Sequence, residues 1–283
     1  MATVNKTRFE LVGADGGPLR GDVRTQGKGA DRPAVVICHG FKGFKDWGFF
    51  PHLAARIARA GMTAVSFNFS GSGVGPDGES FSEHERFGHA TFSADLTDLK
   101  TVVEALHGGD LVEGLARPKP MGLFGHSRGG AAALMFAARE PRAQALVTWS
   151  AIGALARWDE ETIRRWREEG KLDVVNMRTG QVLPLYTDVL DDIAEHASGK
   201  LNLLGAAGSI EVPWLIVHGE QDEAVSPGDA KKLHSAARGG TAELEMIAGG
   251  THTLGARHPW AGYTPELEKG MDLTVAWFSR HLM

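Results

Sequence analysis

A serine between two glycines lies near the middle of the chain, in Gly125-His126-Ser127-Arg128-Gly129. It follows an apolar run at 121–124 and precedes an alanine-rich segment. Five residues of the form G-x-S-x-G occur by chance, but between a buried strand and a helix they become specific. The sharp turn there projects the hydroxyl above the sheet edge, at a helix N-terminus whose dipole favours negative charge. The pattern predicts a nucleophile for acyl transfer at Ser127; a serine N-cap after a glycine-rich loop is the alternative.

A serine hydroxyl is a weak nucleophile and needs a base within hydrogen-bond reach. The chain has 12 histidines, so the choice needs an argument. His252 follows the last strand-like run in a Gly-Gly-Thr turn, where a loop can bring the imidazole over the sheet edge. His126 adjoins Ser127 and should point away from it. His39 and His218 also end strand-like runs, and it is the resemblance given next that assigns them to the oxyanion loop and the acid loop. His252 is then the expected base; a solvated or capping loop histidine is the alternative.

Four stretches of the chain together resemble the α/β-hydrolase superfamily. Within it they resemble the small esterases and acyl hydrolases related to cinnamoyl and feruloyl esterases. They cover about residues 33–255 and keep the superfamily's order of nucleophile, acid and histidine. The stretches are His39-Gly40, the turn at Ser127, His218-Gly-Glu-Gln-Asp222 and Gly249-Gly-Thr-His252.

The resemblance also implies the acid. A carboxylate must fix the tautomer of the base and stabilise its imidazolium. Asp222 fits the motif H-G-x-x-D-x-x-V, and it lies a short turn beyond a strand-like run. Glu220 and Glu223 are close competitors, although both read as solvated turn residues. Asp222 is the expected partner of His252.

Acyl transfer needs hydrogen-bond donors for the developing oxyanion. The backbone N–H of Arg128, directly after the nucleophile, is one candidate. The resemblance implies the other at Phe41, because the His39-Gly40 position shapes the oxyanion loop in this superfamily. A plain strand-to-helix loop is the alternative for the second position.

Short apolar runs and helix-like segments alternate along the chain. The runs lack polar alternation, which is typical of strands buried on both faces of a parallel sheet. The N-terminal runs instead flank a turn-rich segment and predict an antiparallel hairpin. We therefore predict an α/β-hydrolase fold: a mostly parallel, doubly wound sheet with an N-terminal hairpin. The hairpin strands are expected at 7–12 and 19–25, the others at 33–38, 63–68, 121–124, 145–149, 212–217 and 242–247, and the helices at 49–60, 93–106, 131–139, 228–237 and 266–281.

Residues 151–211 interrupt this alternation. They contain no strong buried-strand run but two helical segments, at 158–169 and 187–198. We interpret them as a helical cap inserted into a single domain that spans 1–283. Leu185 in this insertion and Trp47 could line a substrate pocket. Trp149 is the best aromatic candidate, because it closes the strand beside the nucleophile strand.

Composition narrows the partners. A net charge of −5 and a pI of about 6.2 give no reason to expect nucleic acid or an anionic membrane. No apolar run reaches the length of a membrane span, and the first residues lack the core of a signal peptide. With Cys38 the only cysteine, we expect a cytoplasmic protein without an internal disulfide.

The residues predict a serine hydrolase, and the resemblance implies an esterase that acts on small to medium acyl or aryl esters. Its partner would be a small-molecule ester, and the mechanism requires no cofactor or metal. Thioesterases, amidases and peptidases share every catalytic residue and stay open as alternatives. A non-catalytic binding protein of the same fold is the other alternative, because fold alone does not prove activity. The oligomeric state is not indicated.

Overall fold

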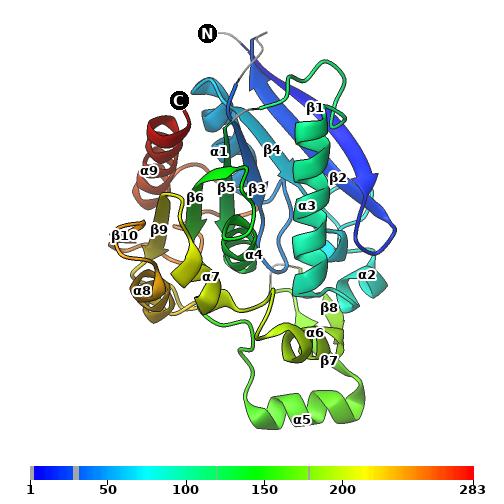
Figure 1. Ribbon diagram of the computed structural model, residues 1–283. Coiled ribbons are helices and arrows are strands. Elements are labelled where there is room, and N and C mark those ends of the chain that lie inside the picture. Colours follow the sequence, from blue (N-terminus) through cyan, green and yellow to red (C-terminus); the bar gives the residue numbers. More distant parts are fainter. Residues whose placement is uncertain (1–2, 28–31, 119, 178) are drawn as a thin grey trace.

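An eight-stranded sheet forms the centre of the protein. The computed structural model describes residues 3–27, 32–118, 120–177 and 179–283. The sheet order is β1-β2-β4-β3-β5-β6-β9-β10 (Figure 1). Its strands are β1 (Val4–Val12), β2 (Pro18–Gln26), β3 (Ala34–Cys38), β4 (Thr63–Phe67), β5 (Met121–His126), β6 (Ala143–Trp149), β9 (Trp214–Gly219) and β10 (Ala242–Ile247). The six neighbouring strands β4-β3-β5-β6-β9-β10 are parallel, while β2 pairs antiparallel with β1 and β4. The predicted fold class is confirmed.

The central strands are buried because both faces of the sheet are covered. In β3 every residue is buried; Val36 and Cys38 face one hydrophobic cluster, whereas Val35 and Ile37 face the other. The alternation of side chains along a strand assigns neighbours to opposite faces. This explains why the runs are apolar without a polar period.

Helices fill the two faces. The first cluster includes side chains from α3 (Phe92–Gly108), α4 (Arg128–Ala137), α7 (Leu203–Ser209) and α8 (Pro227–Ala236). The second includes side chains from α1 (Phe50–Arg59) and α9 (Pro265–Leu282). Between β4 and α3 lie a short 3-10 turn, η1 (Ser70–Ser72), and α2 (His84–Gly88). Within the described ranges, none of these helices is long and apolar enough to cross a bilayer.

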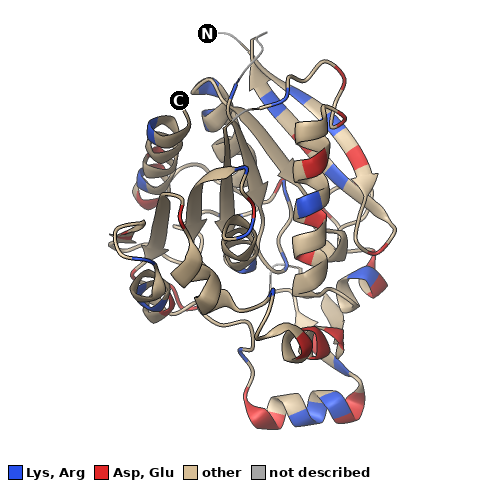
Figure 2. Ribbon diagram, viewed as in Figure 1, with Lys and Arg blue, Asp and Glu red and all other residues tan. Residues whose placement is uncertain are grey.

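The segment 151–211, which we call the inserted segment, lies between β6 and β9. It contains α5 (Glu160–Glu169), β7 (Lys171–Val175), β8 (Val182–Tyr186), α6 (Asp188–His196) and α7. Figure 1 shows α5, β7, β8 and α6 at the end of the molecule opposite the C-terminus of α9. Figure 2 shows charged residues along α5 and α6, and almost none on the central strands.

The inserted segment differs from the expected purely helical one. Its two helical stretches are present, but β7 and β8 form a separate antiparallel hairpin between them. One edge of that hairpin contacts α2 of the main body: the ring of Tyr186 lies close against Gly88. The segment thus contacts the body through this hairpin in addition to its two chain connections.

Candidate active site

Ser127, the predicted nucleophile, lies on the turn between β5 and α4. Its backbone has φ 56° and ψ −119°, a left-handed conformation that L-residues rarely adopt. The flanking glycines permit it. A Cβ at Gly125 would lie 2.2 Å from the carbonyl oxygen of Gly129, and one at Gly129 would lie 2.3 Å from that of His39. The backbone is therefore packed too closely there for any side chain.

Asp222 and His252 lie together at the carboxyl edge of the sheet. Nδ1 of His252 is 2.8 Å from Oδ2 of Asp222. The other carboxylate oxygen, Oδ1, accepts hydrogen bonds from the backbone N–H groups of Ala224 and Val225, at 2.9 and 2.8 Å. With Nδ1–H donating to Asp222, Nε2 of His252 keeps its lone pair for a proton.

The competing carboxylates are elsewhere. Glu220 and Glu223 are exposed turn residues, whereas the side chain of Asp222 is fully buried. A buried carboxylate that accepts several hydrogen bonds is held in one orientation, which an exposed glutamate is not. The geometry thus singles out Asp222 among the three candidates.

His218 is a second imidazole at the same carboxylate, and sequence reasoning assigned it no role. It is fully buried, with Nε2 2.9 Å from the carbonyl oxygen of Val225 and 3.2 Å from Oδ2 of Asp222. Burial alone would raise the pKa of Asp222. Hydrogen bonds from His218 and His252 outweigh it and hold that pKa well below its usual range. Asp222 is therefore ionised at neutral pH.

His126 is the other imidazole that sequence reasoning set aside. It does not hydrogen-bond to Ser127; its Nε2 lies 2.9 Å from the carbonyl oxygen of His252, to which a neutral ring donates. The rings of His126 and His252 lie 4.7 Å apart. Burial lowers the pKa of His126 to about 3, so the ring is neutral and ties the His252 loop to the end of β5.

The loop after β3 brings Phe41 beside the nucleophile. The N–H of Gly43 donates to the carbonyl oxygen of Gly40 at 3.1 Å, which closes a turn around Phe41 and Lys42. A Cβ at Gly40 would lie 3.0 Å from Cβ of Ser127, so this loop touches the nucleophile turn. Arg128 is the first residue of α4, and its N–H has no intrahelical acceptor.

His39 fixes the start of this loop. Its Nδ1 lies 2.9 Å from the carbonyl oxygen of Gly40, and its Nε2 accepts the N–H of Phe69 at 3.1 Å. Accepting at Nε2 requires a neutral ring with the proton on Nδ1. Burial lowers the pKa of His39 to about 4. One neutral imidazole therefore links the ends of β3 and β4.

The side chain of Arg128 forms a buried ion pair below the site. Its Nε donates to Oδ2 of Asp95 in α3 at 2.7 Å, and its guanidinium lies 4.4 Å from the ring centroid of Phe92. Burial raises the pKa of Asp95 to about 6, against the lowering effect of Arg128. The charge of Arg128 is compensated by Asp95, and the pair joins α4 to α3.

Phe41 is supported from the other side by α2. The rings of Phe41 and Phe87 lie 5.3 Å apart. Phe87 also belongs to a small hydrophobic cluster that contains Phe44 and Phe81 of the main body and Leu183 of the inserted segment. The loop that carries Phe41 thus packs between the main body and the inserted segment.

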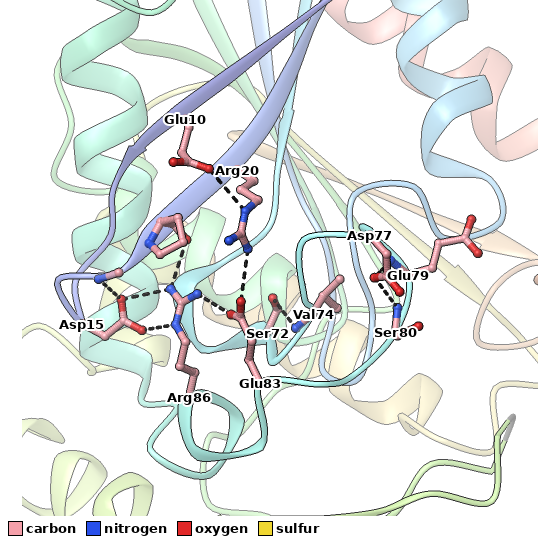
Figure 3. Close-up of polar contacts among 12 residues, drawn as sticks. Glu10, Asp15, Arg20, Ser72, Val74, Asp77, Glu79, Ser80, Glu83 and Arg86 are labelled. Atoms are coloured by element: carbon pink, nitrogen blue, oxygen red, sulfur yellow. Dashed lines mark hydrogen bonds and ion pairs between the residues drawn. The ribbon is translucent and has the colours of Figure 1, made fainter.

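A network of charged side chains holds α2 in place. Figure 3 shows Arg86 between Asp15 and Glu83, and Arg20 between Glu83 and Glu10. Nε of Arg86 lies 2.5 Å from Oδ2 of Asp15, in the turn between β1 and β2. The network ties α2 to the N-terminal hairpin. Through Phe87, the hairpin supports the loop that carries Phe41.

Ser127 and His252 border one cavity of about 590 Å³. Trp47 and Leu185, two expected pocket residues, also line it, and so do Phe41 and Arg128. The inserted segment contributes a large part of the wall: Ile152, Leu155, Arg157, Trp158, Asn176, Met177 and Leu185.

The expectation for Trp149 is not met. Its side chain is only 1% exposed and does not line the cavity. The indole N–H donates to Oγ1 of Thr274 in α9 at 2.9 Å, and the ring stacks on Phe49 at 5.1 Å. The alternation along β6 points Trp149 into the helix-covered face, not over the sheet edge where Ser127 lies.

Within the ranges that the structure describes, no group of three or more His, Cys, Asp or Glu side chains has an arrangement that could hold a metal ion. Cys38 is buried in β3, and burial raises the pKa of its thiol far above the usual range. A thiol of that kind is a poor nucleophile.

Comparisons with known proteins agree with this architecture. The curated 2,6-dihydropseudooxynicotine hydrolase of Paenarthrobacter nicotinovorans is 28% identical over 221 residues, which are 76% of this chain and 51% of that protein. The chain thus spans about half the length of this relative. Two solved structures share the fold: Est1E from Butyrivibrio proteoclasticus, with 19% identity and a TM-score of 0.71 over 96% of this chain and 98% of that one, and GrgF from Penicillium sp. sh18, with 19% identity and a TM-score of 0.72 over 98% and 99%.

The family model described as "Serine aminopeptidase, S33" matches residues 29–173, about half of the chain. This match includes the loop after β3, the turn at Ser127 and the first part of the inserted segment. The chain is therefore a hydrolase of the α/β-hydrolase superfamily and belongs to the serine aminopeptidase S33 family.

Proposed function

We propose that this protein is a serine esterase that cleaves carboxylic esters of small to medium acyl or aryl substrates. Ser127 is the nucleophile, His252 the general base and Asp222 the carboxylate that orients it. One observation carries the proposal: a buried carboxylate holds His252 at the border of the cavity that also contains the strained Ser127. The arrangement supports the proposal because an activated serine needs a base at the same site and a carboxylate that orients that base.

In the proposed reaction, Nε2 of His252 takes the proton of Ser127 as Oγ attacks the ester carbonyl. The backbone N–H groups of Phe41 and Arg128 donate to the oxyanion. His252 then protonates the leaving alcohol, and an acyl-enzyme remains. A water molecule, deprotonated by the same imidazole, attacks the acyl carbon; Ser127 departs with the proton and the acid is released.

We propose further that the inserted segment acts as a cap within a single domain that spans 1–283. Seven of its residues line the cavity, so its fold sets the size and polarity of the substrate pocket. Leu185 and Trp158 offer apolar surface to an acyl or aryl group. The buried single cysteine, Cys38, is compatible with the cytoplasmic location that we propose.

The relatives support a small substrate. One is named a hydrolase of 2,6-dihydropseudooxynicotine, and Est1E has been solved with ferulic acid bound. Both names refer to small molecules. A cavity of about 590 Å³ suits ligands of that size.

An aminopeptidase, despite the name of the family, is a weaker candidate. The free ammonium of a peptide substrate requires an anionic partner at the site. Among the described residues that line the cavity there is no Asp or Glu, while Lys42 and Arg157 add positive charge. These side chains repel an ammonium and favour an ester without one.

The test is the hydrolysis of 4-nitrophenyl acetate, butyrate and octanoate by the wild type and by Ser127→Ala. Ser235→Ala, at an exposed position of α8, is the matched control. We expect turnover in the wild type and the control, and a loss of about three orders of magnitude or more in Ser127→Ala. Turnover that persists in Ser127→Ala would refute the assignment of the nucleophile.

A fluorophosphonate probe distinguishes the enzyme from a binding protein of the same fold. An activated serine forms a covalent adduct that intact-mass spectrometry detects. We expect one adduct on the wild type and none on Ser127→Ala. If the folded wild type gave neither adduct nor turnover, the binding protein would be the better interpretation.

A further inference from the structure

Two cationic side chains border the proposed active-site cavity without a carboxylate partner. Lys42 comes from the loop after β3, and Arg157 from the start of the inserted segment. Neither has a carboxylate oxygen within 4.0 Å among the described residues. The protein as a whole is acidic, with a net charge of −5. Positive charge at this cavity therefore runs against the general composition.

Lys42 occupies a position that glycine would fit better. Its φ is 55°, in the left-handed region, at the third residue of the turn from Gly40 to Gly43. Glycine adopts this conformation at no steric cost. A lysine at this position therefore carries backbone strain that a glycine would not.

Among the described residues, the ammonium of Lys42 makes one hydrogen bond and no ion pair. Its Nζ donates to the carbonyl oxygen of Val175, in the inserted segment, at 3.0 Å. An ammonium has three donors, and the side chain is partly buried, which lowers the pKa of Lys42. A partly desolvated cation bonded to a neutral carbonyl attracts an anion strongly.

Arg157 lines the cavity from the start of the inserted segment. Nη2 donates to the carbonyl oxygen of Ala224, two residues beyond Asp222, at 2.9 Å. Its guanidinium thus lies beside the acid loop, while Lys42 lies beside the oxyanion loop. Arg128, the third cation of the cavity, differs from both because Asp95 compensates it.

We propose that the substrate carries a free, ionised carboxylate besides its ester group, and that Lys42 and Arg157 bind this carboxylate. This inference rests on the proposed function and defines its substrate class as half-esters of dicarboxylic acids or carboxylate-bearing aryl esters. Both cations border the cavity that also contains Ser127, so a carboxylate in that cavity is attracted to them while the ester carbonyl lies at Ser127. The carboxylate of the substrate supplies a full negative charge, whereas the carbonyl oxygens of Val175 and Ala224, which accept from the two cations, are neutral.

The experiment compares two esters that differ only in this charge: mono-4-nitrophenyl adipate and its methyl-capped twin, methyl 4-nitrophenyl adipate. The measured quantity is the ratio of kcat/KM for the anionic ester to that for the neutral one. Any effect of a substitution on both esters alike, such as a looser inserted segment, cancels in this ratio. The same pair is made on the alcohol side with 4-acetoxybenzoate and its methyl ester.

We expect the wild type to prefer the anionic ester in at least one pair, mainly through KM. Lys42→Met should lower the ratio about tenfold, as expected for a charged hydrogen bond at a partly buried site. Arg157→Met, at a more exposed side chain, should lower it about threefold. Lys42→Arg should keep most of the preference. Lys232→Met and Arg164→Met, at exposed positions outside the cavity, are the controls and should leave the ratio unchanged.

A ratio near one in the wild type for both pairs would overturn the inference, and so would a preference that both cavity substitutions leave intact. Failure of the proposed function is seen separately. If the wild type hydrolysed none of the four esters, the proposed esterase activity would be refuted for these substrates, but the anion site could still be tested. Calorimetric titration of Ser127→Ala with monomethyl adipate and with dimethyl adipate then measures the preference directly. Equal affinity for the two would refute the anion site.

Discussion

Acidification should destabilise the protein through His39, the imidazole that links the ends of β3 and β4. Its ring must be neutral, because Nε2 accepts the N–H of Phe69. Protonation would place two donors against each other in a fully buried position. The pKa of His39 is therefore about 4 in the folded protein, against an ordinary value of 6.5. The unfolded chain binds this proton more readily than the folded one.

The size of the effect follows from the two pKa values. Because the folded pKa is depressed, the stability is fully present above pH 6.5 and is lost as the pH falls toward 4. Each pH unit in this window costs about 1.4 kcal/mol. Between pH 7.5 and 5.0 His39 alone should therefore remove about 2 kcal/mol from the free energy of unfolding. That is a large share of the stability of an ordinary domain.

Urea unfolding at pH 7.5 and 5.0, followed by tryptophan fluorescence and circular dichroism, measures this loss. His39→Gln removes the titrating group, so its free energy of unfolding should fall by about 2 kcal/mol less than that of the wild type over the same interval. His234→Gln, at an exposed position of α8, should behave like the wild type. An equal loss in His39→Gln and the wild type would show that His39 is not held neutral by the fold.

Three substitutions test other parts of the site. Asp222→Asn should lower kcat by about three to four orders of magnitude, because His252 loses the partner that fixes its tautomer; a loss below tenfold in steady-state kinetics would exclude this role. Gly129→Ala should cost about 3 kcal/mol or more, since the new Cβ meets backbone at 2.3 Å; a thermal melting curve like that of the wild type would contradict the packing. Trp149→Phe should cost about 1 kcal/mol through the lost hydrogen bond to Thr274 and leave KM for an ester unchanged, whereas a changed KM would restore Trp149 to the pocket.

The sheet could be predicted because its signal is local. The strand-like runs at 33–38, 63–68 and 121–124 match β3, β4 and β5 within one or two residues. A strand buried on both faces needs five or six apolar residues in a row, and few other structures do. The nucleophile turn was accessible for the same reason, because its glycines and its serine are adjacent in the sequence.

The hairpin of β7 and β8 had a weaker signal. Its strands are half exposed, and Lys171–Val175 alternates over only five residues. So short an alternation does not distinguish a strand from a loop between helices. The crossover helix α7 is also short and contains two glycines. These elements depend on contacts with the main body that no local pattern reveals.

The partners of the site residues were hidden by distance along the chain. Asp95 pairs with Arg128 across 33 residues, and His126 bonds to His252 across 126. His218 is the exception: it lies four residues before Asp222 in the same motif. That spacing at a strand end could have suggested a shared hydrogen bond. The prediction for Trp149 was wrong for a related reason. The side of the sheet on which its side chain lies depends on which helices cover β6, and the local sequence does not reveal this.

The order in which the two faces of the sheet are covered bears on how the chain folds during synthesis. The face that contains Trp149 and Phe124 is closed by α1 and by α9, whose Phe278 lies against Gly122. More than a hundred residues are therefore made after β5 before its covering helix exists. Until α9 leaves the ribosome, the nascent chain exposes an apolar surface that chaperones must shield. A shortened chain without α9 should accumulate as aggregate, even though every residue of the proposed active site is present.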